Sequence, residues 1–189
     1  MNLLNLVKSG NSKVNNINSK DNFIMGKDEI LEPKTIRIFD MHFTLNVYYL
    51  KIKSPELNIE KKVVNVFLPI KLRKQNNQAL LKNILYKMYK KITEKEVEII
   101  MEKARHKLGF APEDYSIEKI PGTLATFNKD LQSITINPYI SMYSKEIIEY
   151  IVFHEFCHLK YKNHTKSFYN MLKKYMPDYE KYEIDGFKY

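Results

Sequence analysis

Hydrophobic and polar residues alternate soon after residue 33, which is the pattern of half-buried strands. Apolar side chains recur at every second position in Thr35–Phe39 and again in Phe43–Tyr49. A break at Ser54–Pro55 precedes a third apolar run, Val63–Leu68, which ends at Pro69. The pattern predicts an N-terminal antiparallel β region.

The apolar spacing then changes to three and four residues, which is the period of one buried helix face. It extends over Leu81–Ile92 and, after a short gap, over Val97–Leu108. Within the gap, Thr93-x-x-Glu96 resembles a capping box, which opens a helix. Gly109 is a typical C-terminal stop. The spacing therefore predicts two helices that meet near residue 93.

Three short strands and two more helices are expected in the remaining chain. Ser144 is the predicted N-cap of the first helix. Thr165 or Asn163 caps the last one, which we expect to stop near Met176 because Pro177 follows. The order of strands, helices, strands and helices predicts an α+β fold. The three strands are expected at Tyr115–Ile120, Leu124–Phe127 and Leu131–Ile136.

The amino-acid composition indicates the number of domains and the cellular compartment of the protein. Residues 1–33 are rich in Asn, Ser and Lys without an apolar period, so we expect a flexible polar leader followed by a single domain over residues 34–189. Cys157 is the only cysteine, which excludes an internal disulfide and favours a reducing compartment. No apolar run approaches the roughly 20 residues that cross a bilayer. The sequence predicts a cytoplasmic protein without a membrane partner.

The formal net charge of +9 is compatible with an acidic partner such as nucleic acid. The basic residues are scattered, however, with only short clusters such as Lys71–Lys74 and Lys173–Lys174. A lysine-rich, solvated surface is therefore the favoured interpretation, and nucleic acid is a weakly supported partner.

The most informative segment holds three of the five histidines within eleven residues: His154, His158 and His164. With Glu155, the first two form the H-E-x-x-H motif. On a helix His154 and His158 lie about 40° and one turn apart, so both imidazoles can bind the same ion. Glu155 can reach a water on that ion without ligating it. The motif predicts a zinc site with Glu155 as the general base.

The helix around the motif is predicted to be buried, because Tyr150–Leu159 is apolar nearly all round. Glu155 is the only full charge in that segment, and a buried carboxylate without a partner costs several kcal/mol. A water activated by a metal would compensate it. The alternative is a pair of core histidines that are hydrogen-bonded to Glu155 and have no catalytic role.

His164 is the expected third ligand because it follows His158 by six residues, a spacing found in zinc proteases. Those proteases have a glycine turn where this chain has Tyr161. We therefore expect the helix to continue to Tyr161 and to turn at Asn163, since Asn tolerates a left-handed backbone. Asp178 or an upstream acid is the alternative third ligand.

Three other residues of metal-binding types are assigned structural roles. Cys157 could approach the metal from the other side of His154, but a small buried core residue is its favoured role. His42 and His106 have no potential co-ligand near them in sequence, so we expect both on the surface.

Four short stretches between Leu131 and Tyr179 carry a family resemblance: Ile136–Asn137, Tyr150–Lys160, Asn163–Phe168 and Met176–Tyr179. This segment of about fifty residues resembles the YgjP-like metallopeptidase family, a zincin-like family related to SprT-like zinc proteases. The resemblance implies a zincin-like metallopeptidase domain that binds Zn²⁺. It also implies that His154, His158 and His164 are the metal ligands and that Glu155 is the catalytic base.

One stretch departs from the family pattern. The family usually carries Trp-Gly-Ser-Cys before its asparagine-bearing strand, whereas this chain has Pro121–Leu124 there and contains no tryptophan. The substrate contact or packing that this stretch supplies is therefore in question.

Taken together, these features of the sequence predict a zinc-dependent hydrolase. The favoured interpretation is a metallopeptidase that acts on a peptide or protein. The strand that ends at Ile136–Asn137 is expected to pair with an extended peptide. Two alternatives stay open, a metal-dependent nucleotide phosphohydrolase and a non-catalytic, metal-stabilised nucleic-acid-binding module. Candidate donors to the oxyanion of the transition state are Tyr139, Tyr143 and Tyr169.

Overall fold

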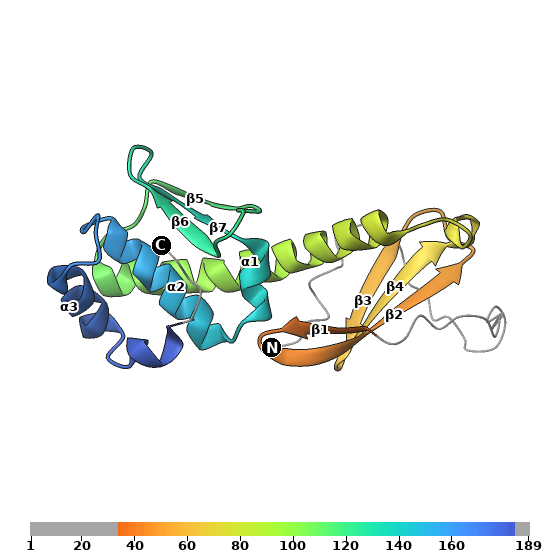
Figure 1. The fold of residues 1–189 in the computed structure, drawn as a ribbon, viewed down its shortest axis with the longest axis horizontal. Coiled ribbons are helices and arrows are strands. Elements are labelled where there is room, and N and C mark those ends of the chain that lie inside the picture. The colour runs from red at the N-terminus through yellow and green to blue at the C-terminus, as the bar shows by residue number, and fades with distance from the viewer. Residues whose placement is uncertain (1–33, 184–189) are drawn as a thin grey trace. The chain divides into compact units, whose positions relative to one another are not determined.

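The computed structural model describes residues 34–183, and the chain divides into two compact units (Figure 1). The first unit includes residues 34–36 and 42–77, and the second includes residues 37–41 and 78–183. The predicted leader lies outside the described residues, and the single domain over residues 34–189 stays a prediction. No helix within residues 34–183 is both long and apolar enough to cross a membrane.

The first sheet has four strands in the order β1-β2-β4-β3. Its strand β4 runs antiparallel to β3 but parallel to β2, so the expected antiparallel β region is in fact mixed. The prediction was wrong because it overlooked β3, a short and mostly polar strand directly after Ser54–Pro55. The β3–β4 hairpin reverses the chain, which brings β4 alongside β2 in the same direction. The strands are β1 (Lys34–Ile38), β2 (Met41–Leu50), β3 (Glu56–Glu60) and β4 (Val63–Pro69).

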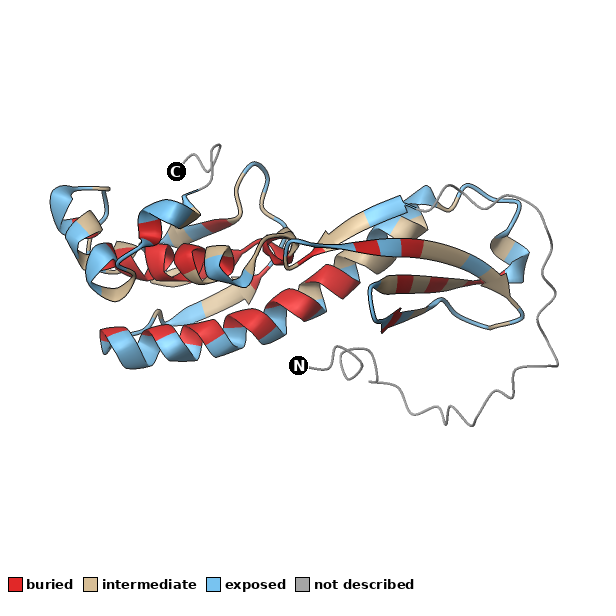
Figure 2. Cartoon of the chain, turned by 90° about the horizontal axis from the view of Figure 1, so that it is seen from below, coloured by how far each residue is buried: buried red, intermediate tan, exposed pale blue. Residues whose placement is uncertain are grey.

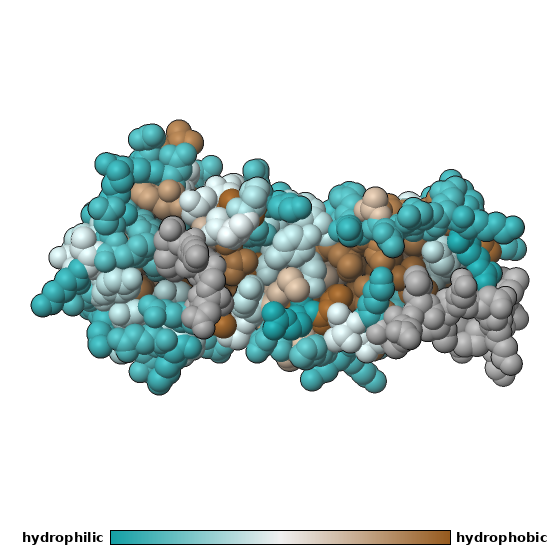
Figure 3. All heavy atoms as spheres, in the orientation of Figure 1, coloured by the Kyte–Doolittle hydropathy of each residue, from teal (hydrophilic) through white to brown (hydrophobic). Residues whose placement is uncertain are grey.

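The two faces of this sheet carry different side chains. Alternate residues of β4, Val64 and Val66, are buried on one face. On the other face the rings of Tyr48 and Phe67 stack with centroids 5.6 Å apart. On the side of the molecule drawn in Figure 3, apolar residues gather over the strands of this unit. A short 3-10 helix, η2 (Ile70–Leu72), follows β4.

The main segment of the second unit, residues 78–183, begins with one continuous helix, α1 (Gln78–Leu108). The sequence predicted two helices there. Thr93 does not cap a helix. Its side chain is buried, and its Oγ1 donates a hydrogen bond to the carbonyl oxygen of Pro138 at 2.6 Å. Glu96 is also buried and pairs with Lys145. The capping-box residues therefore make tertiary contacts. The helix ends before Gly109, as predicted, at a φ of +77°.

A three-stranded sheet and two shorter helices complete this unit and confirm the α+β prediction. The strands β5 (Asp114–Ile117), β6 (Ala125–Asn128) and β7 (Ser133–Ile136) lie in the order β5-β7-β6. The strand β7 is parallel to β5 and antiparallel to β6. Figures 1 and 2 show α1 and α2 (Lys145–His158) on the same side of this sheet. The remaining helical elements are η3 (Pro138–Met142), α3 (Lys166–Tyr175) and η4 (Tyr179–Tyr182).

Three of the predicted helix ends are confirmed. The side chain of Ser144 accepts a hydrogen bond from the backbone N–H of Ile147 and caps α2. Thr165, rather than Asn163, caps α3 in the same way. The helix α3 ends with Met176 as its C-cap, directly before the proline.

The middle position of β7 corrects the expectation that this strand pairs with a peptide. Both edges of β7 are hydrogen-bonded, to β5 and to β6, so neither is available for another strand. The strand β6 lies at the edge of the sheet and also contacts α2. An extended peptide can add to a sheet only at an edge. The edge strand that contacts the motif helix is β6, so β6 and not β7 can pair with a peptide there.

Asn137 fixes the segment that leads from β7 to α2. Its Nδ2 donates hydrogen bonds to the carbonyl oxygens of Ile120 (2.9 Å) and Thr123 (3.0 Å). Its Oδ1 accepts a hydrogen bond from the backbone N–H of Tyr139 at 3.2 Å and caps η3. The side chain is buried, so these bonds replace water that cannot reach these groups.

Replacing Asn137 with Ala should lower the free energy of unfolding by about 2–3 kcal/mol, because three hydrogen bonds of roughly 1 kcal/mol each are lost. Urea unfolding followed by circular dichroism measures the change. The control is Asn170→Ala, at an exposed position of α3. This variant should change the free energy of unfolding by less than about 0.5 kcal/mol. Equal effects of the two variants would contradict the role of Asn137.

Candidate metal centre

The motif helix α2 is buried along most of its length, as predicted (Figure 2). It contacts α1, β6, α3, η3 and η4. The helix ends at His158 and not at Tyr161, although the backbone N–H of Tyr161 still donates to the carbonyl oxygen of Cys157 at 2.9 Å. Asn163 does not take the left-handed backbone that was expected. The tight turn after His158 therefore needs neither glycine nor a positive φ, and it returns the chain to α2 at His164.

The three motif histidines meet at one point. The Nε2 atom of His154 lies 3.2 Å from Nε2 of His158 and 2.9 Å from Nε2 of His164. These three residues are the one group of metal-ligating side chains among residues 34–183 whose donor atoms all lie within 4.8 Å of one another. His154 and His158 come from α2 and His164 from the loop before α3, so two elements build the cluster.

The orientation of His158 shows which nitrogen faces the cluster. Its Nδ1 lies 3.0 Å from the carbonyl oxygen of Tyr161. A carbonyl oxygen can only accept, so Nδ1 carries the proton and donates it. Nε2 of His158 therefore points a lone pair at His154. This is the arrangement of a histidine ligand, whose second nitrogen donates to a backbone carbonyl.

The spacing of the nitrogens fits a metal ion. Nitrogens that lie 2.0–2.1 Å from a tetrahedral zinc are about 3.3 Å from one another. The separations of 3.2 and 2.9 Å in the cluster are close to this value. Lone pairs at this distance repel one another, and one shared proton satisfies a single contact, whereas a cation satisfies all three. Three imidazoles are a donor set that suits zinc and related divalent metals.

Phe168 forms a rigid surface beneath the imidazoles. This residue of α3 has 0% of its side chain exposed. Its ring centroid lies 4.7 Å from that of His154, 4.8 Å from that of His158 and 4.7 Å from that of His164. One aromatic ring thus contacts all three histidines and restricts their rotation.

The surroundings keep the imidazoles neutral. Burial, followed by the proximity of His158 and His164, lowers the pKa of His154 to about 2. Burial likewise lowers the pKa of His158 and that of His164. A metal binds the neutral form of histidine, so at pH 7 the cluster is already in the protonation state that a ligand set requires.

Glu155 is buried beside this cluster, with 1% of its surface exposed. Burial raises the pKa of its carboxyl group to about 8. Within residues 34–183 its carboxylate has no hydrogen bond or ion pair, and the ring nitrogens of the histidines lie close to one another and to the Tyr161 carbonyl, which does not favour the alternative of core histidines bonded to Glu155. A nearby cation would stabilise the charged carboxylate, as the sequence analysis expected.

The other candidate residues lie elsewhere. Cys157 is buried in the core cluster and is not part of the donor group. Asp178 pairs with Lys181 at 3.3 Å and is not part of the donor group. His106 is exposed and lies 2.9 Å from Glu102, and His42 is exposed too, as predicted.

One of the three candidate tyrosines lies at the cluster. The ring of Tyr169 is 6.1 Å from that of His164. Tyr139 instead packs against Tyr89, and Tyr143 lies beneath Arg37. Phe168 was not predicted as part of the site, although it follows His164 by four residues in the sequence.

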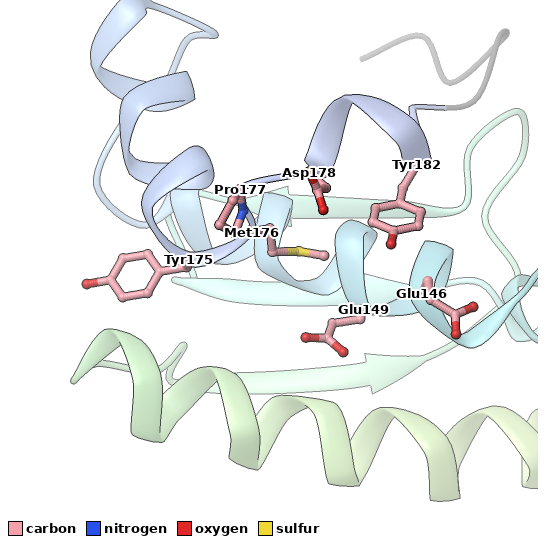
Figure 4. A pocket seen from close by; sticks show the side chains of 7 residues that line it. All are labelled: Glu146, Glu149, Tyr175, Met176, Pro177, Asp178 and Tyr182. Atoms are coloured by element: carbon pink, nitrogen blue, oxygen red, sulfur yellow. The ribbon is translucent and has the colours of Figure 1, made fainter.

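A cavity of about 210 Å³ lies between the first turns of α2 and the chain around η4 (Figure 4). None of the three clustered histidines lines it. It is therefore separate from the candidate metal centre. Its lining residues are Glu146, Glu149, Tyr175, Met176, Pro177, Asp178 and Tyr182.

Comparison with solved structures finds similarity over part of the chain. The metallopeptidase zymogen of Pyrococcus abyssi abylysin is 27% identical, with a TM-score of 0.43, over 46% of this chain and 88% of that chain. The metallopeptidase zymogen of Methanocaldococcus jannaschii jannalysin is 25% identical, with a TM-score of 0.41, over 45% of this chain and 80% of that chain. No curated protein matches the sequence.

A family model covers nearly the whole chain. The model of the YgjP-like metallopeptidase domain matches residues 11–184, which extends the sequence resemblance well beyond the region around the histidines. It includes both units of the described structure. The chain therefore belongs to the YgjP-like metallopeptidase family and is a metal-dependent peptidase.

Proposed function

We propose that the protein is a zinc-dependent peptidase in which His154, His158 and His164 hold the metal and Glu155 is the catalytic base. One observation carries the proposal. The Nε2 atoms of three histidines from two elements converge at separations of 2.9 and 3.2 Å, and Glu155, the residue after His154 on the same helix, is a buried carboxylate that has no partner among the described residues. Membership of a metallopeptidase family supports the same chemistry.

The mechanism assigns separate tasks to the ligands and to Glu155. When bound, zinc acts as a Lewis acid that brings the pKa of water toward 7. The histidines hold their orientation through Phe168 and through the hydrogen bond from His158 to Tyr161. Glu155 accepts the proton of the water that attacks the peptide carbonyl and can return it to the leaving amine.

An extended peptide would pair with the free edge of β6 rather than with β7. The strand β6 contacts α2 and is hydrogen-bonded only to β7 within the described sheet. Main-chain hydrogen bonds at such an edge hold a substrate with little dependence on its sequence. No match favours the nucleotide or nucleic-acid alternatives, so both stay predictions.

Replacing Glu155 with Gln should lower kcat by about 10²–10⁴-fold, because the amide cannot accept the proton. The bound metal should stay at one equivalent, since Glu155 is not a ligand in this proposal. Hydrolysis of quenched fluorescent peptides and metal analysis of the same sample test both statements. The control is Glu146→Gln, in the first turn of α2, which should retain activity. Undiminished hydrolysis by the Glu155→Gln variant would remove Glu155 from the role of base.

Replacing any one of His154, His158 and His164 with Ala should remove bound zinc at micromolar free metal, because a site with two remaining imidazoles binds weakly. Inductively coupled plasma spectrometry of dialysed protein measures the content. His106→Ala is the matched control, since His106 is exposed and lies beside Glu102. If one of the three histidine variants binds as much zinc as this control, the replaced histidine is not a metal ligand.

Cys157 should be neither a ligand nor a reactive thiol. Burial raises its pKa to about 12, and only 1% of the residue is exposed. The folded protein should therefore react with iodoacetamide far more slowly than the protein in urea. Cys157→Ala should keep one equivalent of zinc and lose about 1 kcal/mol of stability. Loss of zinc in this variant would place sulfur in the ligand set.

A further inference from the structure

Three tyrosine rings form a continuous stack beside the candidate metal centre. Tyr179 of η4 lies in the middle. Its ring centroid is 6.5 Å from that of Tyr150 on α2, with the planes only 8° apart. On its other side the centroid is 6.0 Å from that of Tyr169 on α3, at 23°. Tyr179 is buried, with 8% of its surface exposed, Tyr150 is buried as well, and Tyr169 is half-buried.

Each outer ring of the stack contacts a different histidine. Tyr150 meets the ring of His154 edge-on at 5.8 Å, and it lies one helical turn before His154 on α2. Tyr169 contacts the ring of His164 at 6.1 Å. The stack therefore forms a chain of ring contacts from His154 to His164 that passes through Tyr179.

This route matters because the two histidines come from different elements. His154 belongs to α2, whereas His164 belongs to the loop before α3. Their Nε2 atoms lie 2.9 Å apart and must stay near the roughly 3.3 Å that a shared tetrahedral ion requires. A small change in the position of α3 relative to α2 would separate the two nitrogens. Tyr179 contacts a ring on each helix and thereby limits that movement.

The element that carries Tyr179 is itself fixed. The backbone N–H of Tyr179 donates to the carbonyl oxygen of Met176 at 3.1 Å, and that of Lys181 donates to Asp178 at 3.0 Å. Pro177 restricts the backbone between them. The ring of Tyr179 is thus presented from a tight turn directly after α3.

From this geometry we propose that Tyr179 is a positioning residue for the metal centre, which sets the separation of His154 and His164 through Tyr150 and Tyr169. The inference rests on the proposed function, because it assumes that these histidines hold a metal. Ring stacking, rather than the hydroxyl group, performs the role. Tyr179→Phe therefore retains it, and Tyr179→Leu removes it while filling most of the space.

Tyr182 provides a matched control on the same short helix. It is half-buried and lines the cavity between η4 and α2 (Figure 4), and within residues 34–183 its ring makes no contact with a histidine ring. Tyr182→Leu removes the same ring from the same element. It should alter the packing of η4 without altering the histidines.

The test measures metal binding and not turnover. Zinc affinity is determined for the full-length chain by competition with a chromogenic chelator, at a temperature where circular dichroism shows every variant folded. Tyr179→Leu should weaken zinc binding by about 10–100-fold, the usual effect of removing a group that orients a ligand. Tyr179→Phe and Tyr182→Leu should stay within about threefold of the parent protein. The visible absorption of bound Co²⁺ should change in Tyr179→Leu alone.

The outcomes separate this inference from the proposed function. Equal zinc affinity and equal Co²⁺ spectra for Tyr179→Leu and Tyr182→Leu would overturn the role of Tyr179 and leave the metal site intact. A parent protein that binds neither Zn²⁺ nor Co²⁺ would overturn the proposed function, and this inference with it. If Tyr179→Leu does not fold, a weakened affinity in Tyr169→Leu, with an unchanged affinity in Tyr182→Leu, supports the stack, and the reverse refutes it.

Discussion

The convergence of three imidazole nitrogens is the constraint on which the rest of the second unit depends. Nitrogen lone pairs 2.9–3.2 Å apart repel one another unless a cation lies between them, so the surrounding protein has to hold the rings in place. It does so with Phe168, which contacts all three rings, and with the Tyr161 carbonyl, which orients His158. Burial of α2 has two further effects. It keeps the imidazoles neutral, and it raises the pKa of Glu155, which has no ion pair or hydrogen bond to its carboxylate within residues 34–183.

The long helix α1 and the segment before α2 supply the support for this arrangement. Thr93 donates to the carbonyl oxygen of Pro138, and Glu96 pairs with Lys145 at the start of α2. Asn137 holds the same segment to the chain around residues 120–123. The start of α2 is therefore attached to α1, the segment before it is attached to the connection between β5 and β6, and the second half of α2 carries two of the three histidines. The third histidine, His164, lies in the short loop between α2 and α3, which ends at the N-cap residue Thr165.

Local signals in the sequence predicted most elements and the chemistry, and long-range contacts account for what it missed. H-E-x-x-H was informative because the helical period alone brings His154 and His158 together. The capping box at Thr93 wrongly predicted a helix start. Thr and Glu can cap a helix or can bond to residues distant in sequence, and only the fold decides which of these roles they take. The strand β3 was missed because Glu56–Glu60 is short and mostly polar. Tyr179 is 25 residues beyond His154, and no period relates the two.

X-ray absorption at the zinc edge of the purified protein tests the central claim most directly. We expect a shell of nitrogen or oxygen atoms at about 2.0–2.1 Å, with the multiple scattering of three imidazoles and no sulfur. A sulfur scatterer at about 2.3 Å would place Cys157 in the ligand set. That result, or imidazole scattering from fewer than three histidines, would contradict the convergence of His154, His158 and His164 on one ion.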